Sequence, residues 1–106
     1  DESIMKFVKI GTHVEGFTES PPENLRELLE AHSLWLEKQK AEGRLLEAYF
    51  LPGAPHGLNI TVWEFASPED IDKHFWEDPM SFSFDWEIHP AAEVTEHIKH
   101  CLATLT

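Results

Sequence analysis

The sequence is poor in cysteine and in basic residues, and both shortages narrow what the chain can do. Cys101 is its one cysteine, so no disulfide forms within the chain, and a reducing compartment such as the cytoplasm fits best. Eight lysine and arginine residues stand against twenty aspartate and glutamate residues, which gives a formal net charge of -12. This charge repels nucleic-acid phosphates and anionic lipid headgroups. We therefore expect neither nucleic acid nor a membrane among the partners.

Several common sequence signals are also missing. No apolar run approaches the roughly 20 residues that cross a bilayer, and the start lacks the basic-then-apolar pattern of a signal peptide. There is no glycine-rich nucleotide loop, nucleophile elbow or zinc-finger spacing, so we expect no cofactor and no metal. Residues 5–106 are expected to form a single domain, with 1–4 as a disordered or non-native tail before Met5.

Hydrophobic periodicity and turn residues divide the chain into alternating strands and helices. The expected elements are strand 6–14, helix 23–42, strand 45–51, strand 58–65, a short helix from Pro68 that ends before Pro79, strand 82–89 and a terminal helix from Pro90. A Ser followed three residues later by Glu or Asp, with Pro between them, marks the start of each of the first two helices. This order predicts an α+β ferredoxin-like fold, βαββαβ with a C-terminal helix and an antiparallel sheet.

Two helices cover only one face of a four-stranded sheet, so the other face needs a partner. We expect the aliphatic strand positions to lie beneath the helices: Val8, Ile10, Ile60 and Val62. The opposite face would then carry Phe7, His13, Tyr49, Asn59, Thr61, Trp63 and Phe65. A face so rich in aromatic side chains is not stable in water. The interpretation is a homo-oligomer, a dimer or a larger ring, whose paired sheets enclose a pocket.

His32 is the polar residue that stands out on the apolar side of the first helix. The large apolar side chains around it follow helical spacing: Leu25, Leu28, Leu29, Trp35 and Leu36. An imidazole that faces a core needs a hydrogen-bond partner, and imidazole is the side chain best suited to proton transfer near neutral pH. The alternative is a structural histidine bonded to a backbone carbonyl.

The order of several short motifs resembles the dimeric α/β barrel superfamily, and within it the YCII-like and muconolactone isomerase-like proteins. The resembling residues are His32, Trp35-Leu36, Gly43-Arg44-Leu45, Ser67-Pro68-Glu69, Asp78-Pro79 and His89-Pro90. The resemblance implies a His32–Asp78 pair near a pocket, in which Asp78 orients the ring for general acid and base catalysis. Asp78 shares a helical face with Ile71, His74 and Phe75, so it can point toward the sheet.

Three function hypotheses stay open at this point. The favoured one is a small cofactor-independent isomerase or lyase of the muconolactone isomerase type, which moves a proton on a small cyclic or aromatic-derived substrate. His32 and Asp78 would be catalytic, and the substrate would be bound by Trp63, Asn59, Tyr49, His13, Thr61 and His89. The second is a cofactor-free monooxygenase of an aromatic or polyketide-like substrate, which depends on Asn59 and Trp63, roughly 13 Å apart along one strand. The third is a non-catalytic ligand-binding or assembly module.

The terminal helix offers one further arrangement of ligating side chains. Three potential metal ligands recur at helical spacing and could coordinate a metal ion: Glu93, His97 and His100. They flank the apolar stripe of this helix, so the interpretation is a solvated face.

Overall fold

The structure is a computed structural model and describes residues 4–13, 21–54 and 57–105. Its elements are β1 (Met5–His13), α1 (Pro22–Ala41), β2 (Leu45–Leu51), β3 (Leu58–Phe65), α2 (Pro68–Trp76), β4 (Phe84–Ala91) and α3 (Val94–Thr104). This order confirms the predicted α+β class. Val14 at the end of the predicted first strand and Ser20 of the predicted helix cap lie outside the described residues.

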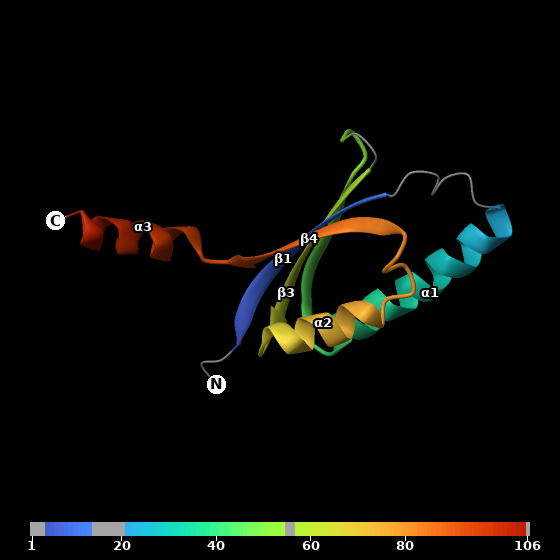
Figure 1. Cartoon of the computed structure of the whole chain (residues 1–106), viewed down its shortest axis with the longest axis horizontal. Helices are drawn as coiled ribbons and strands as arrows, with labels where there is room; N and C mark the ends of the chain where they lie inside the picture. The colour runs from blue at the N-terminus through green and yellow to red at the C-terminus, as the bar shows by residue number, and fades with distance from the viewer. Residues whose placement is uncertain (1–3, 14–20, 55–56, 106) are drawn as a thin grey trace.

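The strands form one antiparallel four-stranded sheet in the order β2-β3-β1-β4. β1 lies between β3 and β4, so the first and last strands of the βαββαβ unit are neighbours, as a ferredoxin-like fold requires. Helices α1 and α2 lie on one face of the sheet, whereas α3 extends away from the body (Figure 1). None of the helices in the described part of the chain combines the length and the apolar character that a membrane span needs.

Local sequence accounts for where the helices begin and end. Ser67 Oγ accepts a hydrogen bond of 3.2 Å from the backbone N–H of Asp70, with Pro68 between them, and this caps α2 as expected. Gly43 follows α1 with a φ of 83°, a left-handed conformation that glycine adopts without strain. The last strand runs two residues beyond its predicted end and includes Pro90. The terminal helix begins only at Val94, because the carboxylate of Glu93 accepts from the backbone of Glu96 and caps it there.

The predicted assignment of the two sheet faces is wrong, because the faces are exchanged. The side beneath the helices carries the aromatic residues and forms the core of Phe7, Trp35, Leu45, Trp63, Phe65, Ile71 and Phe75. The aliphatic residues Val8, Ile10, Ile60 and Val62 are half-buried on the opposite side. Alternation shows which residues share a face, but not which face the helices cover. Here the large rings fill the space between the sheet and two helices, where they bury the most area.

Only the second half of α1 packs on the sheet. Trp35 and Gln39 are buried, but Leu29, nearer the start of the helix, is exposed. Figure 1 shows the first turns of α1 running past the edge of the sheet. The apolar stripe predicted along the whole helix is therefore a core stripe only from about His32 onward.

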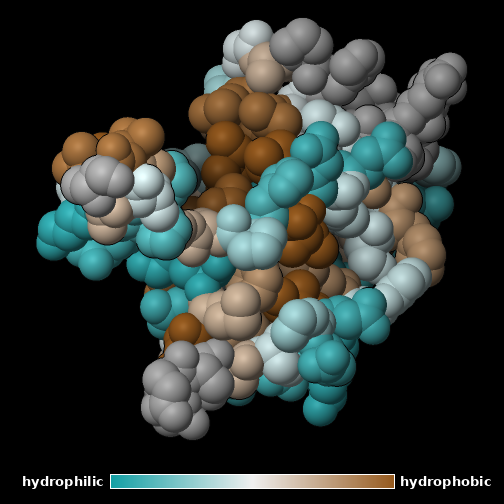
Figure 2. Space-filling view, turned by 60° about the vertical axis from the view of Figure 1, so that its left-hand side comes forward, coloured by the Kyte–Doolittle hydropathy of each residue, from teal (hydrophilic) through white to brown (hydrophobic). Residues whose placement is uncertain are grey.

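Two apolar surfaces of the described chain remain uncovered. One is the outer sheet face, whose half-buried aliphatic side chains are surrounded by exposed Tyr49 and Leu51, and Figure 2 shows an apolar patch where this side is turned forward. The other is the stripe of α3, in which Val94, Ile98 and Leu102 are all largely exposed. Apolar surface of this kind marks an interaction site.

Candidate active site

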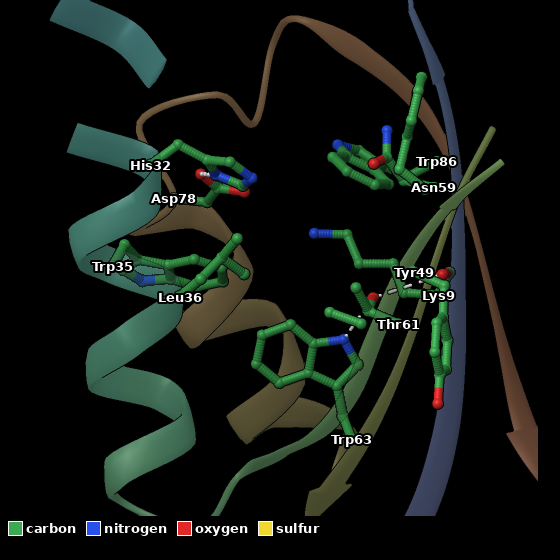
Figure 3. A pocket seen from close by; sticks show the side chains of 12 residues that line it. Lys9, His32, Trp35, Leu36, Tyr49, Asn59, Thr61, Trp63, Asp78 and Trp86 are labelled. Atoms are coloured by element: carbon green, nitrogen blue, oxygen red, sulfur yellow. Dashed lines mark hydrogen bonds and ion pairs between the residues drawn. The ribbon is translucent and has the colours of Figure 1, made fainter. Parts of the chain in front are cut away.

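A cavity of about 200 Å³ lies between the sheet and the helices of a single chain. Side chains from α1, the sheet and the α2–β4 connection line it: Lys9, His32, Trp35, Leu36, Asn59, Thr61, Trp63, Asp78 and Trp86, among others (Figure 3). Asn59, Thr61 and Trp63, which were predicted to line a pocket between two sheets, line this cavity beneath the helices instead. The reason is the exchange of faces, which turns the mixed aromatic and polar face inward.

His32 and Asp78 meet at the rim of this cavity. His32 Nδ1 lies 2.7 Å from Asp78 Oδ1, across 46 positions of sequence. A carboxylate only accepts hydrogen bonds, so Nδ1 carries the hydrogen and donates it, which leaves Nε2 as the nitrogen available to a ligand. The His32 side chain is one-fifth exposed (20%) and that of Asp78 is almost fully buried (1%). The arrangement is a histidine oriented by a carboxylate, with its other nitrogen free to move a proton.

The turn after α2 holds Asp78 in place. Its Oδ1 also accepts a bond of 2.9 Å from the backbone N–H of Met80, and its own N–H donates to the carbonyl of Phe75. Oδ2 is buried and has no hydrogen-bond partner among the described residues. One carboxylate oxygen thus builds the turn and orients His32, while the other remains unsatisfied beside the cavity.

Lys9 is the site residue that the sequence analysis missed. It is 2% exposed, and its Nζ lies 3.8 Å from the ring centroid of Phe75 and 3.7 Å from that of Trp86. In Figure 3 the ammonium points across the cavity toward His32 and Asp78. Desolvation by burial lowers the pKa of Lys9 from 10.5 to about 8, and the charge of Asp78 opposes this shift. Lys9 lies on the same face of β1 as the core residue Phe7. A lysine on an aromatic strand face is itself a signal that sequence reasoning could have used.

Burial of Lys9 predicts a stability that rises with pH. Below pH 8 the amine is protonated in both the folded and the unfolded chain, so the cost of burying the charge is fully present. Between pH 8 and 10.5 the folded chain releases the proton first, and the free energy of unfolding increases by roughly 3 kcal/mol. Titratable groups that share a cavity with Lys9 are His32, Tyr49, Asp72 and Asp78.

Urea unfolding at several pH values, for the wild type and for Lys9→Met, checks this expectation. The other groups titrate in both proteins, so the difference between the two curves isolates Lys9. The difference should be largest in neutral solution and shrink as the pH approaches 10.5. A difference that does not change with pH would show that Lys9 is not buried as described.

Three of the predicted substrate-binding residues lie together on β3 and line the cavity. Trp63 is almost fully buried, and its Nε1 donates a bond of 2.7 Å to Thr61 Oγ1. Thr61 in turn donates to the backbone carbonyl of Lys9 at 3.4 Å. The Trp63 indole N–H and the Thr61 hydroxyl both form hydrogen bonds within the protein. Of the three residues, Asn59 therefore has the polar group best placed to bind a ligand.

The other three predicted binding residues are placed differently. Tyr49 was predicted on the same face as Asn59 and Thr61, but it pairs with Ile60, so its side chain lies on the outer face although its position borders the cavity. It is 57% exposed, and its hydroxyl, which points away from His32 in Figure 3, donates to Glu47. This hydrogen bond and the charge of Glu47 raise the pKa of Tyr49. His89 pairs with Val8 on the outer face, where it contacts Glu87. His13 is the last residue of β1, and its side chain lies outside the described part of the structure.

The terminal helix presents its histidines to solvent. His97 and His100 are exposed, and Glu93 caps the helix. Within the described residues, no three histidine, cysteine, aspartate or glutamate side chains are grouped so that they could hold a metal ion.

Comparison with known proteins gives matches in structure alone. No protein-family model matches the sequence, and no curated protein matches it. The structure is similar to that of 5-chloro-2-hydroxyhydroquinone dehydrochlorinase from Burkholderia phenoliruptrix AC1100 in complex with 2,5-dihydroxybenzoquinone, with a TM-score of 0.67 and 16% identity over 84% of this chain and 95% of that one. This likeness establishes the fold. The chain has the ferredoxin-like fold of the dimeric α/β barrel proteins.

Two further solved structures are more distant. One is a conserved protein from Methanosarcina mazei Go1, with a TM-score of 0.49 and 12% identity over 86% of this chain and 97% of that one. The other is a Streptomyces coelicolor monooxygenase in complex with nanaomycin D, with a TM-score of 0.43 and 12% identity over 88% and 92%.

Proposed function

We propose that the protein is a small cofactor-independent isomerase or lyase that moves a proton on a one-ring substrate. The observation that carries this proposal is the 2.7 Å contact between His32 and Asp78 at the edge of the cavity. Asp78 holds the imidazole with Nδ1 protonated, so Nε2 can take a proton from a ligand carbon and return it elsewhere on the same molecule. Such a step needs only a proton acceptor and donor.

The size of the cavity indicates the size of the substrate. An apolar cavity of about 150 Å³ is enough to hold benzene. The present cavity, of about 200 Å³, therefore fits one ring with one or two oxygen substituents. The ligand named for the dehydrochlorinase, 2,5-dihydroxybenzoquinone, is also a single ring, with four oxygen substituents, and elimination of HCl from a ring is a lyase reaction. A muconolactone-type isomerisation is the corresponding proton shift without a leaving group.

A simple test is the conversion of cyclohex-3-enone to cyclohex-2-enone, followed by the absorbance of the conjugated product. The reaction removes a proton next to the carbonyl and returns one to the far end of the double bond, so it reports proton transfer on a small ring. We expect the protein to accelerate this conversion, or that of muconolactone, without oxygen uptake. No acceleration of either probe would contradict the proposal.

The monooxygenase hypothesis is less well supported by the geometry. It relies on Asn59 and Trp63, but the Trp63 indole N–H is already bonded to Thr61 and the ring is packed in the core. A polycyclic substrate is also larger than the single ring that the cavity of about 200 Å³ holds. Measuring oxygen uptake with an oxygen electrode distinguishes the two enzyme hypotheses, because oxygen consumption with an aromatic substrate would favour the monooxygenase. A purely structural role accounts for Asp78, which holds the turn after α2, but not for the buried ammonium of Lys9.

We also propose that a second copy of the chain covers the outer sheet face and the stripe of α3. The aliphatic side chains of the outer sheet face are half-buried and the apolar side of α3 is exposed, so both surfaces would lose contact with water if a second copy packed on them. Such self-complementary burial is the usual solution for symmetric oligomers.

Ile98→Glu should convert this oligomer to a monomer. Ile98 is on the apolar stripe of α3, which does not pack on its own body, so the charge blocks burial between copies without breaking a contact within one chain. Sedimentation velocity measures the change in mass. His100→Glu places the same charge on the opposite side of α3 and should leave the oligomer intact. Equal behaviour of the two variants would argue against the proposed interface.

A further inference from the structure

We propose that Lys9 is the anion-binding group of the cavity and that the ligand is a one-ring phenolate or enolate whose ionised oxygen contacts Lys9 Nζ. This inference rests on the proposed function and names its substrate class. It assigns to Lys9 a role in binding the charge that develops when His32 removes a proton.

The first argument is that the buried Lys9 ammonium has no direct hydrogen-bond or ion-pair partner among the described residues, although the charge of Asp78 offsets part of the cost of burial. Its Nζ lies 3.8 Å from the ring centroid of Phe75 and 3.7 Å from that of Trp86. Aromatic faces stabilise a cation by about 0.5–2 kcal/mol, well below the cost of removing it from water. Buried charges in proteins are ordinarily paired. An anionic oxygen of a ligand would supply the missing partner.

The second argument is the unpartnered carboxylate oxygen on the other side of the cavity. Asp78 is 2% exposed, its Oδ2 has no hydrogen-bond partner in the described structure, and it lines the same cavity as Lys9. Oδ2 accepts hydrogen bonds and repels anions. The cavity thus offers a cation at one end and an acceptor beside His32 at the other. A ligand that satisfies both carries a negative oxygen at one end and a hydroxyl or an acidic C–H at the other.

The third argument is that the aromatic side chains lining the cavity favour a delocalised anion over a compact one. Lys9 is flanked by Trp86 and Phe75, and Trp35 and Trp63 complete an aromatic lining. A phosphate carries up to two compact negative charges, and here a single cation would face it beside the carboxylate of Asp78. A phenolate or enolate spreads one charge over a flat ring that packs against aromatic side chains. The cavity therefore favours the ring anion.

The binding test uses 4-nitrophenol, whose ionised form has its own absorbance, and its methyl ether 4-nitroanisole, which has the same ring but cannot ionise. The wild type should bind 4-nitrophenolate at least about tenfold more tightly than 4-nitroanisole, as a charge-assisted hydrogen bond implies. In Lys9→Met this preference should disappear, while 4-nitroanisole binds as before. Lys73→Met removes an exposed lysine of α2 and should change neither affinity.

The outcomes separate this inference from the proposed function. Equal binding of the two probes by the wild type, or an unchanged preference in Lys9→Met, would overturn the role of Lys9. The Lys9→Met protein should fold, because methionine fills the same space without a buried charge, and its unfolding midpoint should not fall. His32→Gln should retain the preference for 4-nitrophenolate. If His32→Gln also isomerises the enone as fast as the wild type, the proposed function fails while the assignment of Lys9 stands.

Discussion

His32→Gln is expected to lower the rate of ring isomerisation by a factor of about 10²–10⁴, the usual contribution of a general acid or base. Glutamine retains a side chain that can donate to Asp78 Oδ1, so the 2.7 Å link between α1 and the α2–β4 turn has a replacement. It has no group that exchanges a proton near neutral pH. The rate should therefore fall while the free energy of unfolding changes little. The enone assay and urea unfolding, measured on the same samples, check the two halves of this expectation.

Asp78→Asn tests the other half of the pair. The amide oxygen can still accept from Met80, so the turn is kept, but the negative charge that orients His32 and stabilises its protonated form is lost. We expect a smaller loss of rate, about 10–100-fold, and a combined variant that is no slower than His32→Gln alone, because the two residues act as one unit. His100→Gln, on the exposed side of α3, is the matched control and should leave the rate unchanged. Losses that multiply in the double variant would show that the residues act separately.

Local sequence was sufficient to predict the helices and strands, whereas the His32–Asp78 pair was implied by the resemblance. Proline, glycine and capping residues mark the ends of α1 and α2, and alternation marks the strands, so the bounds of β2 and β3 match the prediction. The resemblance in the order of the motifs implied the His32–Asp78 pair, and the structure places the two side chains 2.7 Å apart across 46 positions. Asp78 lies two residues beyond the end of α2, in the turn that follows the helix, so helical spacing alone does not locate it.

The location of the cavity and the role of Lys9 could not be predicted from the sequence. Both depend on which sheet face the helices cover, and alternation is symmetric with respect to that choice. The volume of the side chains determines which face the helices cover. The rings of Trp63, Phe65 and Phe75 fill the space beneath the helices, whereas Ile60 and Val62 would leave part of it empty. Because the aromatic face lies beneath the helices, Lys9 on that face is buried in the core. A charged residue on a strand's aromatic side was the available signal.

Gly11→Ala is expected to displace the Trp86 ring and to destabilise the fold by roughly 1–3 kcal/mol, the range for overpacked sites. Gly11 pairs directly with Trp86 across β1 and β4, and a Cβ at Gly11 would lie 2.0 Å from a carbon of that ring. Such a contact is impossible, so the indole must rotate. It would break its bond of 3.1 Å to the Ser81 carbonyl and leave its place 3.7 Å from Lys9 Nζ.

The same change should therefore act on the site as well as on stability. Without the Trp86 face, Lys9 is more open to water, and the preference for 4-nitrophenolate over 4-nitroanisole should decrease. Trp86→Leu combined with Gly11→Ala removes the clash, so the double variant should be less destabilised than the sum of the single changes. Urea unfolding of the four proteins gives this coupling energy, and quenching of tryptophan fluorescence reports the exposed ring. Strict additivity would mean that the ring does not lie over Gly11, because only direct contact makes the two positions depend on each other.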